Sequence, residues 1–100
     1  MAMKPKTVVT YRTTATCPIH ARTEIPARDF NVVIDEPIER GGTNLGPTPT
    51  EAAMTALIAC TNVIGNKNAH RLGIDLGEIT IDAACTFGRR GVRNSFGSRY

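Results

Sequence analysis

The sequence predicts a single small α+β domain of 100 residues, in which antiparallel strands precede one long buried helix and a further strand follows it. Segments rich in β-branched residues lie before residue 35, an apolar helical pattern follows residue 48, and an alternating pattern begins at residue 79. Four short strands barely cover a helix that is apolar on nearly every side. Either a second chain covers the rest of the helix, or part of the sequence is missing.

Three strands are predicted ahead of the helix. Residues 7–14 (TVVTYRTT) are rich in β-branched side chains, residues 22–25 form a short second strand that Pro26 ends, and residues 30–34 (FNVVI) form a third. The turns between these segments are short, which favours an antiparallel meander.

The segment between the first two predicted strands contains Cys17 and His20 in the order Cys-Pro-Ile-His. Pro18 breaks the strand pattern, so we interpret the segment as a turn. A zinc site needs three or four ligands, and the sequence shows no second pair of ligands at a suitable spacing. No metal site is therefore predicted.

The helix has clear start and stop signals. Thr48 is expected at the N-cap, Pro49 at the first helical position and Glu51 at the third, which completes a capping box. Gly73 suits the position just after the helix end, and the last turns carry the basic residues Lys67, His70 and Arg71. Before the helix, residues 35–42 form a polar connector and residues 43–47 supply turn formers.

Cys60 lies near the middle of this helix. Five apolar residues lie within about 60° of it around the helix axis: Ala53, Ala56, Leu57, Val63 and Ile64. From this pattern alone, Cys60 is most simply interpreted as a small buried hydrophobic residue. A reactive thiol instead requires a nearby cation, which has to come from another segment because the helix dipole acts only within the first turn.

After the helix, residues 79–87 (ITIDAACTF) alternate between apolar and more polar side chains, which predicts a half-buried strand. Cys85 falls on the apolar side of this strand, so a structural role is favoured for its thiol.

Composition limits where the chain works and what it binds. The sequence contains no apolar run long enough to span a membrane, and its first residues lack the hydrophobic core of a signal peptide. We therefore expect a cytoplasmic protein with no membrane association and three free thiols.

The net charge of +3 belongs to residues 88–100, which contain four arginines and no acid. A disordered tail is favoured there over a nucleic-acid contact.

Several of these residues together resemble the OsmC/Ohr family, the osmotically inducible protein C and organic hydroperoxide resistance proteins. The resemblance covers residues 7–87 and rests on an acidic-Pro connector, a Gly-Gly-Thr-Asn turn, a Pro-x-Glu helix start and a cysteine nine residues after that glutamate. In this sequence these are residues 35–37, residues 41–44, residues 49–51 and Cys60.

The resemblance implies a peroxiredoxin-like hydroperoxide reductase for oxidative-stress defence. Cys60 matches the redox-active peroxidatic cysteine and Glu51 the glutamate that orients an arginine, for which Arg22 is preferred over Arg12 and Arg28. Glu51 and Cys60 are nine residues apart and face opposite sides of the helix, so Glu51 would act through that arginine. The family forms intertwined homodimers and uses organic hydroperoxide as substrate, with an external thiol or dithiol as reductant and no bound cofactor.

The same resemblance implies a chain that is shortened at its C-terminus, without the second long helix and its resolving cysteine. A cycle that uses one cysteine and an external thiol is the function expected. The alternative is a catalytically impaired OsmC-like scaffold, or a dimer that binds an apolar ligand. We therefore expect an enzyme, but one whose turnover has to be measured.

Overall fold

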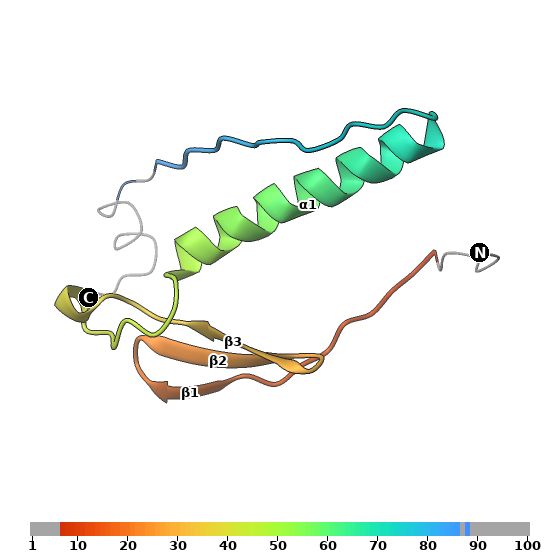
Figure 1. Ribbon diagram of the computed structural model, residues 1–100. Helices are drawn as coiled ribbons and strands as arrows, with labels where there is room; N and C mark the ends of the chain where they lie inside the picture. The colour runs from red at the N-terminus through yellow and green to blue at the C-terminus, as the bar shows by residue number, and fades with distance from the viewer. Residues whose placement is uncertain (1–6, 87, 89–100) are drawn as a thin grey trace. The chain divides into compact units, whose positions relative to one another are not determined.

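The computed structural model describes residues 7–86 and residue 88. Within these residues the elements follow in the order β1 (Thr16–Ile19), β2 (Arg22–Ala27), β3 (Phe30–Ile34), the 3-10 helix η1 (Ile38–Arg40) and α1 (Pro49–Arg71), as Figure 1 shows. The predicted α+β class is confirmed at this level. The chain divides into two compact units, Met1–Ala52 and Ala53–Tyr100, which we call the N-terminal and C-terminal units.

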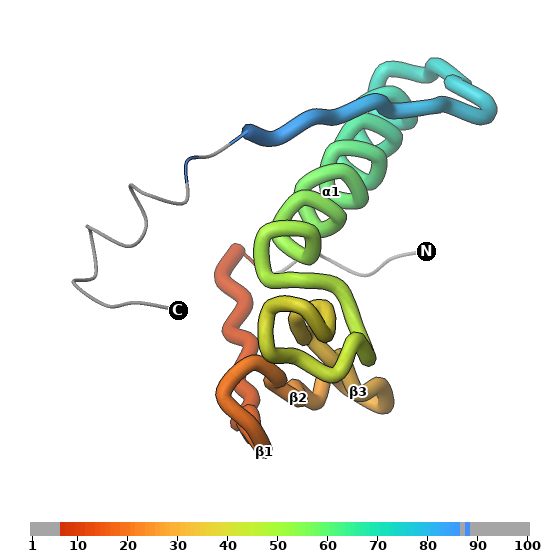
Figure 2. Tube along the Cα trace, turned by 90° about the vertical axis from the view of Figure 1, so that its left-hand side faces the viewer, coloured from red at the N-terminus to blue at the C-terminus, as the bar shows by residue number. Residues whose placement is uncertain are grey.

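The N-terminal unit contains an antiparallel sheet with the strand order β1-β2-β3, labelled in Figures 1 and 2. The meander and the third strand are therefore confirmed, and the second strand is two residues longer than predicted. β2 runs through Pro26, which pairs with Asn31 of β3. Proline is accepted there because Glu24 is the last β2 residue paired with β1, so no bond to β1 is lost at Pro26.

The prediction of a first strand at residues 7–14 is wrong. Residues 8–15 form no strand, and β1 instead lies at Thr16–Ile19, in the segment that we interpreted as a turn. β1 accommodates Pro18 because it is an edge strand whose pairing with β2 is irregular between Thr16 and Ile19. The earlier segment keeps one side-chain link to the sheet, a 2.7 Å hydrogen bond from Thr13 Oγ1 to the Pro26 carbonyl oxygen.

Both predicted ends of the helix are confirmed. At the start, the Thr48 amide donates to Glu51 Oε1 at 2.9 Å and the Glu51 amide donates to Thr48 Oγ1 at 3.2 Å, which is a capping box. At the end, Gly73 has φ +73°, and the amides of Gly73 and Ile74 donate to the carbonyls of His70 and Ala69. These two bonds form a Schellman motif, which glycine permits because it adopts positive φ without strain.

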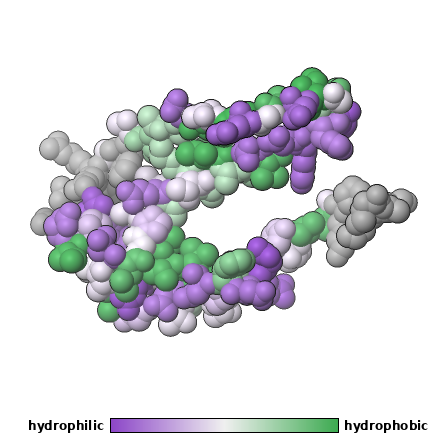
Figure 3. Space-filling model, viewed as in Figure 1, coloured by the Kyte–Doolittle hydropathy of each residue, from purple (hydrophilic) through white to green (hydrophobic). Residues whose placement is uncertain are grey.

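The expectation of a buried central helix is wrong for the single chain. Leu57, Val63 and Ile64 of α1 keep 68%, 49% and 53% of their surface exposed, and Ala69 is the one buried apolar residue among those described. Figure 3 shows apolar surface along the helical unit. The apolar pattern is real, but the C-terminal unit alone supplies too few residues to cover it.

The predicted strand after the helix is not formed by residues 79–86, and Phe87 lies outside the described residues. The chain reverses at Gly73 and continues as an extended segment, drawn in teal to blue in Figure 1. Four of its residues, Gly77, Glu78, Ile79 and Ile81, line a pocket together with residues of α1. Of the predicted basic tail, residues 89–100 lie outside the described part of the chain.

Candidate functional site

The most organised polar group in the N-terminal unit is the carboxylate of Asp35, directly after β3. Its side chain is fully buried. Oδ1 accepts the Glu36 amide at 2.8 Å, and Oδ2 accepts the Leu45 amide at 3.1 Å and the Thr43 hydroxyl at 2.5 Å. The Thr43 amide lies 3.3 Å from both oxygens. Residues 35–45 therefore wrap around one carboxylate that has a full set of donors.

Backbone bonds close the same loop. The Asp35 amide donates to the Pro47 carbonyl at 2.9 Å, and the amides of Gly42 and Asn44 donate to the carbonyls of Pro37 and Glu36. The loop then leads directly to Thr48 and the start of α1. The predicted polar connector is thus a compact structural element, which we call the Asp35 loop and define as residues 35–47.

The hydrogen bonds to Asp35 change its ionisation. Burial acts to raise the pKa of the carboxyl group, but the bonds from the Thr43 hydroxyl and from the amides of Leu45, Glu36 and Thr43 outweigh it. Together they lower the pKa from 3.8 to about 2. The loop is therefore built around an ionised carboxylate.

We expect the stability of the N-terminal unit to fall in acid because of this group. A carboxyl group whose pKa is lowered by folding stabilises the folded state above its unfolded pKa. The contribution of Asp35 is thus complete above pH 3.8 and is lost as the pH falls through about 2. Urea unfolding followed by circular dichroism between pH 5 and pH 2 measures this loss.

Asp35→Asn is the control for that measurement, because asparagine does not titrate and the other carboxylates stay in place. The difference in unfolding free energy between the two proteins should shrink as the pH falls from 4 to 2. A difference that stays constant over this range would contradict the proposed ionisation.

Arg22 of β2 is connected to this loop. Its Nη1 donates to Thr43 Oγ1 at 2.7 Å, and that hydroxyl donates in turn to Asp35. Its Nε lies 3.3 Å from Glu24 Oε2, but this buried nitrogen has no hydrogen-bond partner of good geometry. Hydrogen bonds through Thr43 thus join Arg22 on the sheet to the buried Asp35 carboxylate. The Nε–H of the guanidinium makes no hydrogen bond within the described residues.

The other predicted site residues lie in simpler surroundings. Glu51 is exposed, and one of its carboxylate oxygens accepts the Thr48 amide. Cys60 is an exposed free thiol on α1. Arg22 and Glu51 belong to the N-terminal unit and Cys60 to the C-terminal unit, and the structure describes these units separately. Of the alternative arginines, Arg28 lies in the turn between β2 and β3 with its guanidinium carbon 5.2 Å from the centre of the Phe30 ring.

The remaining cysteines are also exposed free thiols. Cys17 lies in β1, where its Sγ is 3.8 Å from Thr23 Oγ1, and Cys85 lies in the extended segment after the helix. Across residues 7–86 and 88, no three His, Cys, Asp or Glu side chains lie together in a way that could hold a metal ion. The same residues contain no helix with the length and apolarity needed to cross a lipid bilayer.

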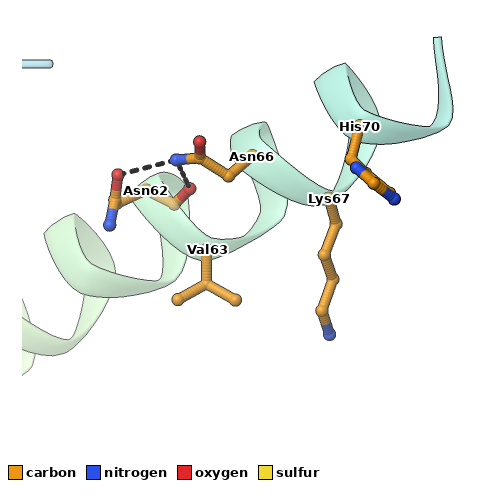
Figure 4. A pocket seen from close by; sticks show the side chains of 5 residues that line it. All are labelled: Asn62, Val63, Asn66, Lys67 and His70. Carbon is orange, nitrogen blue, oxygen red and sulfur yellow. Dashed lines mark hydrogen bonds between the residues drawn. The ribbon is translucent and has the colours of Figure 1, made fainter. Parts of the chain in front are cut away.

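A shallow hollow runs along the second half of α1. Figure 4 shows its five lining side chains, Asn62, Val63, Asn66, Lys67 and His70. Asn66 Nδ2 donates to the backbone oxygen of Asn62 at 2.9 Å and to its Oδ1 at 3.0 Å. One helix supplies all five residues, so this hollow is a feature of the helix surface and does not enclose a ligand.

Sequence reasoning missed Asp35 and Thr43 as central residues. The available signal was an acid at the end of a strand pattern, followed within eight residues by two glycines and a threonine. That signal also fits an exposed connector, because burial of the acid depends on backbone donors that only the folded loop supplies.

Comparisons of the chain with protein-family models, with curated proteins and with solved structures found no significant match. The likeness to the OsmC/Ohr family therefore stays a prediction that rests on the residues described above.

Proposed function

We propose that the protein is a homodimeric thiol peroxidase of the OsmC/Ohr type that reduces organic hydroperoxides through Cys60. The observation that carries this proposal is the exposure of the Cys60 thiol on a long helix, among apolar residues. A peroxidatic thiol has to be reached by its substrate, and apolar neighbours favour an alkyl hydroperoxide over hydrogen peroxide. We place this activity in the cytoplasm, where free thiols persist.

The reaction has two stages. The Cys60 thiolate attacks the terminal oxygen of the hydroperoxide, the O–O bond breaks, and the alkoxide leaves and takes up a proton as an alcohol. Cys60 is then a sulfenic acid. A reductant thiol condenses with it to a mixed disulfide and releases water, and a second thiol of the reductant restores Cys60. No bound cofactor takes part.

Arg22 is the cation that we propose for the thiolate, with Glu51 orienting it, and Arg12 and Arg28 as alternatives. The contacts of Arg22 support this choice because they hold the cation in place: its Nη1 donates to Thr43 Oγ1, and its Nε lies 3.3 Å from Glu24 Oε2. A cation next to a thiol favours the thiolate form. Arg22→Gln should therefore slow the alkylation of Cys60 at neutral pH, whereas Arg28→Gln should leave it unchanged.

The second candidate is an OsmC-like scaffold that does not turn over, or a dimer that binds an apolar ligand. The position of Cys85 favours this second candidate. Cys85 lies in an extended segment and does not occupy the helix position of a resolving cysteine. The two candidates differ in one measurable property, which is peroxide consumption.

Cys60→Ser is expected to abolish the consumption of an organic hydroperoxide in the presence of a dithiol, a loss of at least about 100-fold because the covalent intermediate cannot form. The loss is measured by a peroxide assay on the purified full chain. Cys17→Ser and Cys85→Ser are matched controls and should keep most of the activity, since the proposed cycle uses one cysteine. A folded wild-type protein that consumes no peroxide would favour the scaffold.

A further inference from the structure

The hydroxyl of Thr43 lies between two charged groups of the N-terminal unit. Its Oγ1 is 2.7 Å from Arg22 Nη1 and 2.5 Å from Asp35 Oδ2. A hydroxyl has one hydrogen to donate and two lone pairs that accept, whereas a guanidinium only donates and an ionised carboxylate only accepts. The direction of both bonds is therefore fixed: Thr43 donates to Asp35 and accepts from Arg22.

Asp35 keeps the hydroxyl in this role. Hydrogen bonds from Thr43, Leu45 and Glu36 lower the pKa of the Asp35 carboxyl group to about 2, so at neutral pH it has no hydrogen to donate. The Thr43 amide also lies 3.3 Å from both carboxylate oxygens, which ties the backbone of Thr43 to the same group. The oxygen atom that accepts from Arg22 is thus held in place through its side chain and through its backbone.

The bond to Thr43 determines how the Arg22 guanidinium is oriented. A second contact, between Arg22 Nε and Glu24 Oε2 at 3.3 Å, is an ion pair without hydrogen-bond geometry, so it attracts the cation but does not fix the guanidinium plane. The side chain of Glu24 is also 38% exposed, compared with 17% for Arg22, and solvent weakens its attraction for the cation. The orientation of Arg22 therefore depends on the Thr43 hydroxyl.

Thr43 orients Arg22 without neutralising it. A carboxylate bonded directly to the guanidinium would offset much of its positive charge, whereas the hydroxyl keeps the Asp35 carboxylate one residue further away. The attraction between two charges falls as their separation grows. A neutral partner of this kind suits a cation that has to act on another group.

We infer that Thr43 is a positioning residue of the proposed peroxidase: its hydroxyl holds the guanidinium of Arg22 in the orientation that stabilises the Cys60 thiolate. This inference rests on the proposed function, in which Arg22 is the cation for Cys60, and it adds the residue that makes the cation effective. Thr43 acts through Arg22 and takes no part in the bonds that form or break during peroxide reduction.

The alkylation rate of Cys60 tests this role on the full chain, with Cys17 and Cys85 replaced by serine so that one thiol reacts. Thr43→Val removes the hydroxyl and should slow alkylation by iodoacetamide about threefold to tenfold at neutral pH, because each unit of thiol pKa changes the thiolate fraction about tenfold. Thr43→Ser keeps the hydroxyl and should react at the wild-type rate. Thr43 is an exposed residue, and Thr43→Ala is a second variant without the hydroxyl if valine does not fit the loop.

Repeating the Thr43 substitution in an Arg22→Gln background separates a positioning role from a structural one. If Thr43 acts through Arg22, Thr43→Val has no further effect on alkylation once Arg22 has been replaced. An equal slowing in both backgrounds, or a wild-type rate for Thr43→Val when Arg22→Gln is slow, would overturn the inference. An unchanged rate in Arg22→Gln itself would remove the cation and the positioning role together.

The same measurements distinguish failure of this inference from failure of the proposed function. Alkylation needs a reactive Cys60 but no peroxide turnover. A protein that consumes no peroxide but shows the non-additive effect of Thr43 and Arg22 would lose the proposed peroxidase activity and keep Thr43 as the residue that positions Arg22.

Discussion

Replacing Gly46 by alanine is expected to destabilise the N-terminal unit by at least about 3 kcal/mol, at the upper end of the cost of overpacking. A Cβ atom on Gly46 would overlap the carbonyl group of Val33 in β3. The Gly46 backbone fixes the position of the Cβ atom and its neighbour is a backbone carbonyl, so no side-chain rotation can relieve the overlap. Thermal unfolding followed by circular dichroism measures the effect as a large fall in Tm, or as loss of the transition.

Two other glycines are controls for the Gly46 prediction. A Cβ on Gly65 in the middle of α1 would meet no atom within 4 Å, so Gly65→Ala should stabilise the helix by about 0.5–1 kcal/mol. Gly41 is equally open but has φ +88°, and Gly41→Ala should cost about 1–2 kcal/mol through backbone strain. Comparable losses for Gly41→Ala and Gly46→Ala would show that the close approach to β3 is not the cause.

Asp35→Ala is expected to disorder the Asp35 loop. The substitution removes the acceptor of the amides of Glu36, Thr43 and Leu45 and of the Thr43 hydroxyl, and it leaves these donors inside the loop without a protein partner. Unsatisfied buried donors are costly, and we expect Tm to fall by about 10 °C or more. Hydrogen exchange of the Leu45 amide should accelerate at the same time.

Glu36→Ala is the matched control, because it removes the neighbouring carboxylate. Glu36 Oε1 lies 3.0 Å from Arg40 Nε in an ion pair that is partly exposed on both sides. Such pairs contribute little to stability, so Tm should change by no more than a few degrees. Similar effects of the two substitutions would mean that negative charge alone, and not the hydrogen bonds to Asp35, supports the loop.

The features that could be predicted from the sequence are those that depend on residues close together in the chain. The helix start follows from Thr48 and Glu51, which bond to each other's amides across one turn, and the helix end follows from Gly73. β3 was predicted with its observed bounds because it is a short apolar segment limited by turn residues. In each case the deciding interactions lie within a few residues.

The features that could not be predicted depend on partners elsewhere. Residues 7–14 and 79–86 have strand-like patterns, but a strand also requires backbone pairing with a neighbour, and neither segment belongs to the described sheet. The same argument applies to the site. The pattern around Cys60 indicated an apolar surface, yet its exposure depends on what covers α1. Asp35 was overlooked because its donors come from the fold of the loop.

The short spans of the N-terminal hydrogen bonds also have a consequence for folding kinetics. The longest side-chain link described there, from Arg22 to Thr43, crosses 21 residues, and the Asp35 loop closes on itself between Asp35 and Pro47. Contacts of small sequence separation cost little loop-closure entropy and form quickly. Since this unit ends at Ala52, all its residues leave the ribosome before the part of α1 that follows Ala52. We therefore expect the sheet and the Asp35 loop to form during translation, before the whole of the long helix has left the ribosome.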